Sequence, residues 1–111
     1  MSYYSTFSYE FSSDIEIVNL GELNKKVTEL KYDMAESVIT EKEDGGYYIT
    51  TQSQSHGEFY DSEDFAKLMS RYIGKGHLDT IYCGEDGETS GYRIRPNNIK
   101  ELTMNFTVKE D

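Results

Sequence analysis

The chain has 111 residues, which is enough for one domain but not for two, so we expect a single domain over residues 1–111. Only 36% of the residues are apolar, but ten Tyr and five Phe can bury a large area, which argues against a disordered chain. The 21 acidic and 11 basic residues give a net charge of −10, which disfavours direct binding to nucleic acid or to an anionic membrane.

The sequence contains one cysteine, Cys83, so an internal disulfide is excluded. It has no N-terminal apolar run of the kind found in signal peptides, and no apolar run long enough to cross a bilayer. These features predict a cytoplasmic protein without membrane contact.

The N-terminal part predicts a strand followed by a helix. Aromatic and polar residues alternate over residues 3–11, which is typical of a strand with one face on a core, and residues 15–18 extend it. Asn19 and Glu22 have the spacing of a helix-capping box. Apolar residues then recur every three or four positions, which predicts a helix over about residues 20–32.

Residues 37–43 and 47–52 are predicted to form two strands of a hairpin. They flank Asp44-Gly45-Gly46, and an Asp-Gly pair suits a tight turn because both residues tolerate positive φ.

The clearest pattern is an amphipathic helix over residues 61–74. Acidic residues occupy its first turn, Asp61 or Ser62 is expected to cap its first amides, and Gly74 is expected to close its last turn in a left-handed conformation. A helix this short needs a sheet beneath its apolar face. That face consists of Phe65, Leu68, Met69, Tyr72 and Ile73.

Three more strands are predicted over residues 78–83, 89–95 and 101–109, with turns between them. In the last one, Leu102, Met104, Phe106 and Val108 are expected to face the core. The order β-α-β-β-α-β-β-β predicts an α+β fold with a mostly antiparallel sheet of five to six strands and two helices on one face. The opposite face should be polar and open to solvent. The residues expected on it are Thr6, Ser8, Glu10, Arg93, Arg95, Thr103, Asn105 and Thr107.

No catalytic, cofactor-binding or metal-binding residues are predicted. The glycine-rich segment 84–91 carries acidic residues that repel phosphate, and it lacks the ligand spacing of an EF-hand. Cys83 and His77 would lie about 20 Å apart on one strand, too far for a nucleophile and its base. Arg93 and Arg95 share one strand face and are expected to neutralise acids across the sheet. A hydrolase that uses Cys83 or a carboxylate pair is the less favoured alternative.

Negative charge is concentrated at two hairpin tips and at the start of the second helix. If folding brings these places together, they form an acidic face in which carboxylates and tyrosines imitate phosphates and bases, and which suits a Lys/Arg channel. The alternative is a charge that only keeps the protein soluble. The candidate partner-binding residues are Glu41, Glu43, Asp44, Glu58, Asp61, Glu63, Asp64, Glu85, Asp86, Glu88, Tyr47 and Tyr60.

Three short segments carry a resemblance to a group of small acidic proteins encoded by phages and prophages. They are MSYYSTFSYEF at residues 1–11, GEDGE at residues 84–88 and GYRI at residues 91–94. Proteins of this group begin with a Tyr-Tyr strand and carry a Gly-Glu-rich turn before an aromatic strand. The resemblance implies a phage origin more than an activity. Phage genomes also encode small acidic inhibitors of host nucleases, including anti-CRISPR proteins and DNA mimics, so such an origin favours inhibition without indicating any residue.

We therefore expect a non-catalytic acidic binding protein, an anti-CRISPR-like phage inhibitor that acts in the host cytoplasm. Its partner would be a host protein with a basic nucleic-acid-binding surface, such as a CRISPR effector, and no cofactor is expected. The alternative is a small interaction or assembly module that uses the open sheet face or a sheet edge to bind another protein or to form a homodimer.

Overall fold

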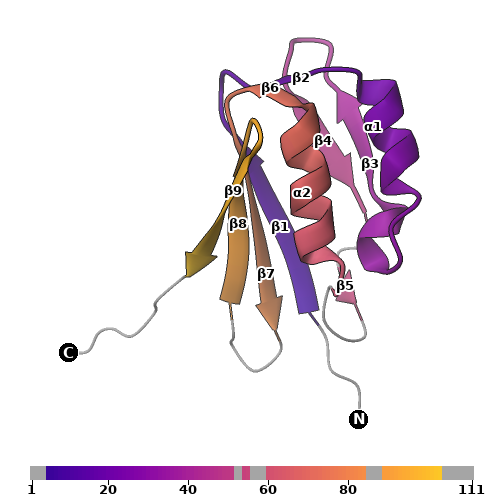
Figure 1. Ribbon diagram of the computed structural model, residues 1–111, viewed down its shortest axis with the longest axis vertical. Coiled ribbons are helices and arrows are strands. Elements are labelled where there is room, and N and C mark those ends of the chain that lie inside the picture. The colour runs from indigo at the N-terminus through magenta and orange to yellow at the C-terminus, as the bar shows by residue number, and fades with distance from the viewer. Residues whose placement is uncertain (1–4, 52–53, 56–59, 85–88, 104–111) are drawn as a thin grey trace, which may run out of the picture.

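The main sheet has five antiparallel strands in the order β5-β1-β7-β8-β9 (Figure 1). The computed structural model describes residues 5–51, 54–55, 60–84 and 89–103. The strands of the main sheet are β1 (Ser5–Phe11), β5 (Gln54–Ser55), β7 (Leu78–Gly84), β8 (Thr89–Arg95) and β9 (Asn98–Thr103).

Two small antiparallel sheets and three helical segments complete the described part of the chain. In the small sheets, β2 (Glu16–Ile17) pairs with β6 (Ile73–Lys75), and β3 (Val38–Glu41) pairs with β4 (Tyr47–Thr50). The helical segments are α1 (Leu20–Val27), the 3₁₀ helix η1 (Asp33–Glu36) and α2 (Ser62–Tyr72).

The predicted α+β class, the mostly antiparallel sheet and the two helices are confirmed. The predicted order lacks η1 and the strands β2, β5 and β6. Each of these elements has four residues or fewer, which is too short to show a helical or strand period in a sequence.

Helix α1 begins as predicted but ends earlier. The Asn19 side chain accepts a hydrogen bond from the Glu22 amide (3.4 Å) and donates one to the Glu22 carboxylate (3.0 Å). The predicted end near residue 32 is wrong, because the helix stops at Val27. Beyond it, the Tyr32 amide donates to the side chain of Asp61 (2.9 Å), so that amide is bound outside any helical ladder.

Helix α2 has the predicted apolar face, but both predicted ends need correction. Its N-cap residue Asp61 makes no side-chain cap, because that side chain bonds elsewhere. At the other end, the positive-φ residues of the described chain do not include Gly74. The chain instead enters β6 directly, and the Val18 amide donates to the Tyr72 carbonyl (2.8 Å), so strand pairing satisfies the helix end in place of a glycine cap.

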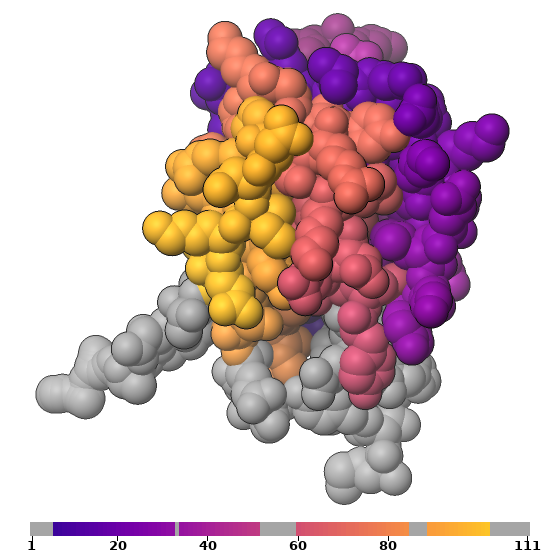
Figure 2. All heavy atoms as spheres, viewed as in Figure 1, coloured from indigo at the N-terminus to yellow at the C-terminus, as the bar shows by residue number. Residues whose placement is uncertain are grey.

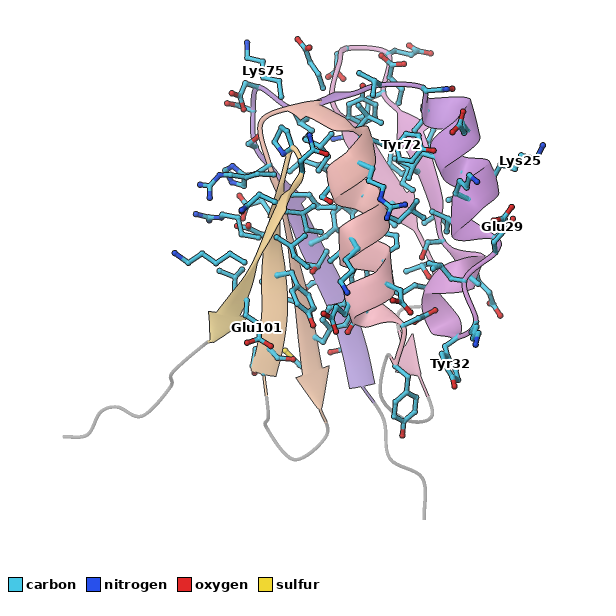
Figure 3. The ribbon with its side chains drawn as sticks, in the orientation of Figure 1. Lys25, Glu29, Tyr32, Tyr72, Lys75 and Glu101 are labelled. Atoms are coloured by element: carbon cyan, nitrogen blue, oxygen red, sulfur yellow. The ribbon has the colours of Figure 1, made fainter. Side chains whose placement is uncertain are left out.

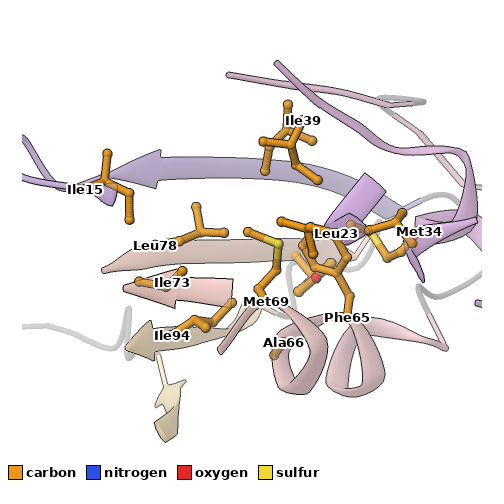
Figure 4. Packing of buried hydrophobic residues seen from close by; sticks show 13 residues of the cluster. Ile15, Leu23, Met34, Ile39, Phe65, Ala66, Met69, Ile73, Leu78 and Ile94 are labelled. Carbon is orange, nitrogen blue, oxygen red and sulfur yellow. The ribbon is translucent and has the colours of Figure 1, made fainter. Parts of the chain in front are cut away.

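The hydrophobic core lies between one face of the main sheet and the two helices (Figure 4). Helix α2 packs on β8 and β9, whereas α1 packs on α2 and on β3. From β1 and β7, alternate side chains point into this core, including Phe7 and Leu78. The fully buried apolar residues with less than 2% exposure are Leu23, Val27, Met34, Ile39, Phe65, Ala66, Met69, Leu78 and Ile94.

Polar side chains attach the β3–β4 hairpin to the rest of the domain. Asn24 of α1 bonds both the amide (2.8 Å) and the carbonyl (2.9 Å) of Ile39, as a neighbouring strand would. The Tyr9 hydroxyl accepts a hydrogen bond from the Ile49 amide (3.0 Å). The predicted turn of this hairpin is confirmed, with Gly45 and Gly46 both at positive φ.

The second face of the main sheet, here called the open face, carries polar side chains as predicted. Thr6, Ser8, Glu10 and Arg95 are exposed on it. Asn105 and Thr107 lie outside the described residues. The predicted phase of the last strand is wrong, because β9 begins at Asn98. Its register places Ile99 toward the core and Leu102 on the open face, in one row with Gly91 and Ile81. Thr103 falls in the next row, with Ser90 of β8 and the buried Tyr82 of β7.

Gly91 provides a test of the β7–β8 contact. A Cβ atom at this position would overlap the Thr80 carbonyl, so only glycine allows the two strands to approach as they do. We expect Gly91→Ala to lower the free energy of unfolding by about 1–3 kcal/mol, as overpacking does. Gly21→Ala is the control, because it meets open space on α1 and should leave the protein equally or more stable by up to about 1 kcal/mol. Urea denaturation of both variants measures the difference, and equal effects would contradict the contact.

Candidate functional site

Of the three predicted acidic clusters, the two within the described residues, at the β3–β4 tip and at the start of α2, lie at opposite ends of the main sheet. Ser5 pairs with Gly84 at one end, and Phe11 pairs with Leu78 about 20 Å away at the other. The β3–β4 tip lies at the second end, where the Tyr47 ring contacts the Phe11 ring (centroids 6.0 Å apart). Helix α2 begins at the first end (Figure 1). These two clusters therefore do not meet, and the condition for a single acidic face is not fulfilled for them.

The structure places the twelve predicted partner-binding residues in three groups. Glu41, Glu43, Asp44 and Tyr47 belong to the β3–β4 hairpin, and Tyr60, Asp61, Glu63 and Asp64 belong to the start of α2. The remaining four, Glu58, Glu85, Asp86 and Glu88, lie outside the described residues.

Tyr47 has a structural partner in the fold. Its hydroxyl accepts a hydrogen bond from the Ile17 amide (3.1 Å), and its ring is half-buried against Phe11. It therefore joins the hairpin to β2. The prediction that Tyr47 is a partner contact is not supported by this geometry, because the hydroxyl that would reach a partner is already bound.

Asp61 was predicted as part of an acidic surface, and that prediction is wrong because only 1% of the residue is exposed. One carboxylate oxygen accepts the Tyr32 amide (2.9 Å), and both oxygens lie within hydrogen-bond distance of the Met34 amide (3.1 and 3.2 Å). The Asp61 carbonyl also accepts the first amide of the helical ladder, that of Phe65 (2.9 Å). Asp61 thus clamps the chain between α1 and η1 onto the start of α2.

This clamp brings together two exposed tyrosines, one of which the sequence did not indicate. Tyr32 is 54% exposed and Tyr60 is 67% exposed, yet their rings are in contact, with centroids 5.6 Å apart. Tyr60 immediately precedes Asp61, and Tyr32 is held through its own amide by the same carboxylate. Figure 3 shows Tyr32 at the end of the molecule at which α2 begins.

The first turn of α2, which follows Tyr60 in the chain, carries acidic side chains. Glu63 and Asp64 are both exposed, and Lys67 neutralises Glu63 only weakly, at 3.5 Å and in contact with solvent. Helix α2 packs on β8. Burial, followed by the charge of Glu63, raises the pKa of Tyr92 on β8. We call the group Tyr32, Tyr60, Glu63 and Asp64 the tyrosine end.

A shallow hollow of about 320 Å³ lies between α2 and the β8–β9 turn. Figure 2 shows β9 and α2 side by side on this surface. The Asn97 amide donates to the Ser70 carbonyl (2.8 Å) and so fixes the turn against the helix. The hollow is open and offers no paired acid and base. Its lining residues are Lys67, Ser70, Arg71, Asn97, Asn98 and Ile99.

Other groups considered for chemistry stay apart. Cys83 lies on the open face near one end of β7, where Thr89 donates a weak hydrogen bond to its sulfur (3.8 Å), while His77 precedes the other end of the strand. Among the described residues, no three His, Cys, Asp or Glu side chains are placed to hold a metal ion. None of the helices within the described ranges is long and apolar enough to cross a membrane.

Arg93 neutralises an acid across the sheet, as predicted for the arginine pair. Its guanidinium makes two hydrogen bonds of 2.8 Å to the two carboxylate oxygens of Asp79 on β7. Such a two-pronged contact is the strongest geometry available to this ion pair.

The sequence matches no protein-family model, and comparison with curated proteins and with solved structures yields no match either.

The clamp predicts a large cost for removing the Asp61 carboxylate. We expect Asp61→Ala to lower the free energy of unfolding by about 1–3 kcal/mol, because the Tyr32 and Met34 amides then lose the oxygens to which they donate. Asp44→Ala, in the exposed hairpin tip, is the matched control and should change stability by less than about 0.5 kcal/mol. Urea denaturation at pH 7 checks both values, and equal stabilities would refute the clamp.

The Asp79–Arg93 pair predicts a pH effect. The hydrogen bonds from Arg93 lower the pKa of Asp79 below its ordinary value of 3.8. A folded-state pKa below the unfolded value stabilises the fold above that unfolded value and loses the effect as pH falls through the folded pKa. The free energy of unfolding of Asp79→Asn should therefore fall less steeply below about pH 4 than that of the wild type. The measurement is urea denaturation of both proteins at a series of pH values from 7 down to acid. If the pair had no effect, the free energy of unfolding would fall with pH equally steeply in the wild type and in Asp79→Asn.

Proposed function

We propose that the protein is a non-catalytic binding protein whose tyrosine end docks onto a basic surface of a partner protein. The observation that carries this proposal is the pair of exposed rings of Tyr32 and Tyr60, which pack against each other. The buried side chain of Asp61, the residue after Tyr60, accepts a hydrogen bond from the Tyr32 amide. Tyrosine is enriched in the residues that dominate binding energy at protein interfaces.

The rigid support of the rings favours binding. A loose aromatic side chain loses rotamer and backbone freedom when a partner immobilises it, and this loss weakens the complex. Here the backbone of Tyr32 is already held by a buried carboxylate, and Tyr60 adjoins the helix cap. Much of the ordering is therefore complete before binding, so a larger share of the contact energy contributes to affinity.

The charge around the rings supports a basic partner. The exposed carboxylates Glu63 and Asp64 lie within four positions of Tyr60, and the whole chain carries a net charge of −10. Surfaces that bind single-stranded nucleic acid combine basic grooves for phosphates with positions that stack bases. Carboxylates beside two aromatic rings offer a matching set of groups, so such a surface is the partner type we propose.

The biological setting that we propose is phage anti-defence. The resemblance of residues 1–11 and 84–94 to small acidic phage proteins, together with the acidic tyrosine end, supports an anti-CRISPR-like inhibitor. Its partner would be a host protein with a basic nucleic-acid site, such as a CRISPR effector. The β3–β4 tip lies at the far end of the molecule and takes no part in this contact.

The test is displacement of labelled nucleic acid from purified CRISPR effectors. We expect Tyr60→Ala and Tyr32→Ala each to raise the dissociation constant roughly thirtyfold, which corresponds to the loss of about 2 kcal/mol at an interface hot spot. The binding of the wild type should also weaken as salt rises. Tyr48→Ala is the control, since Tyr48 is exposed on β4 away from the site and should leave the dissociation constant unchanged.

Thermal melting must show that the tyrosine variants remain folded. Displacement by both tyrosine variants with wild-type affinity would contradict the proposed docking site. Failure of the wild type to displace nucleic acid from any effector would contradict the proposed partner.

A further inference from the structure

One row of side chains on the open face changes sign from one side of the sheet to the other. The strand register aligns Glu10 of β1 with Asp79 of β7, Asp79 with Arg93 of β8, and Arg93 with Lys100 of β9. Read across the four strands, the charges are negative, negative, positive and positive. The row is therefore an electrostatic dipole that lies across the strands.

The two inner members of this row are already paired, but the two outer members are not. Asp79 and Arg93 form the ion pair described above. Glu10 and Lys100 are both exposed, and within the described part of the chain neither forms an ion pair. Three strand spacings separate them, about 14 Å, so they cannot reach each other in one molecule.

The neighbouring row carries apolar side chains. Its members are Ser8, Ile81, Gly91 and Leu102, in the same strand order. Ile81 and Leu102 are half-buried on this mostly polar face, and Gly91 between them is buried. The row therefore presents two partly exposed apolar side chains on either side of a close backbone contact.

We propose that the open face pairs with the open face of a second copy of this chain, through a two-fold axis parallel to the strands. Such an axis exchanges the two sides of the sheet, so β1 of one copy lies over β9 of the other at the usual sheet spacing of about 10 Å. Glu10 of each copy then faces Lys100 of its partner, and Ile81 of each faces Gly91 of its partner, where no side chain stands in the way. Every contact occurs twice, as in any two-fold interface.

This arrangement is specific to one orientation. A two-fold axis across the strands would place β1 over β1 and β9 over β9, so that Glu10 would face Glu10 and Lys100 would face Lys100. The order of charges in the row thus selects the axis parallel to the strands. The contact area is small and largely polar, and both copies are acidic, so we expect a weak dimer with a dissociation constant in the micromolar range or above.

The pairing uses a different surface from the tyrosine end, so the two proposals stand or fall separately. Tyr32 and Tyr60 lie on the helix side of the molecule, and Tyr60→Ala should dimerise as the wild type does. Likewise, a variant that disrupts the open face should still bind a partner through the tyrosine end.

Charge reversal with sedimentation equilibrium tests the dimer. We expect Glu10→Lys and Lys100→Glu each to raise the dimer dissociation constant tenfold or more, because each creates two like-charge contacts. An equimolar mixture of the two variants should regain wild-type association as a heterodimer, since each reversed charge then meets its opposite. Glu29→Lys and Lys25→Glu, on the exposed side of α1, carry the same changes in net charge and should associate as the wild type does (Figure 3).

Three results would overturn the proposal. One is a wild type that stays monomeric to roughly millimolar concentration, far above the expected dissociation constant. Another is association of the single variants that equals that of their α1 controls. The third is a mixture of the two variants that remains as dissociated as each alone, which would exclude the orientation derived from the register.

Discussion

The buried carboxylate of Asp61 is the interaction on which the functional end of this protein depends. Burying a carboxylate away from water is costly unless hydrogen bonds replace its hydration. Here the backbone amides of Tyr32 and Met34, which are distant in the sequence, supply those hydrogen bonds. Removing one partner of such a contact is more expensive than the contact is worth, because an unsatisfied group remains buried. The segment between α1 and η1 is therefore tied to the start of α2, and the exposed tyrosines are positioned as a consequence.

The same use of polar side chains in place of regular pairing recurs elsewhere in the domain. Asn24 takes the place of a strand beside Ile39, and the hydroxyls of Tyr9 and Tyr47 hold backbone amides of β4 and β2. A small, aromatic-rich chain has little aliphatic material for its core, and its tyrosines combine buried ring area with a polar tip. The high tyrosine content is thus partly structural, and an exposed pair such as Tyr32 and Tyr60 is the exception that indicates a binding surface.

The sequence predicted the elements whose pattern is local. The 3.6-residue period of α2, the alternation of β1 and the Asp44-Gly45-Gly46 turn all appear where expected. It did not predict the places where a hydrogen bond to a distant residue replaces a local helix cap or strand pairing. An aspartate before a helix has the same appearance whether it caps that helix or bonds a distant loop, so the burial of Asp61 had no sequence signal.

The candidate site shows the same limit. Glu63 and Asp64 were predicted from their position in the first turn, but Tyr32 was assigned to a helix that ends at Val27. Its neighbour Tyr60 is nearly thirty positions away, and only the clamp joins them. Convergence of the acidic clusters depended on the direction of the β3–β4 hairpin. That direction is set by contacts of Tyr47 and Asn24 with distant residues, which no local sequence pattern shows.

The most direct test of the account is a nuclear Overhauser measurement between the ring protons of Tyr32 and Tyr60. The account predicts a strong ring-to-ring signal in the wild type and its loss in Asp61→Ala, while signals within the core between Phe65 and Leu78 persist. Absence of the signal in the wild type, or its full retention in Asp61→Ala, would contradict the claim that a buried carboxylate positions the binding surface.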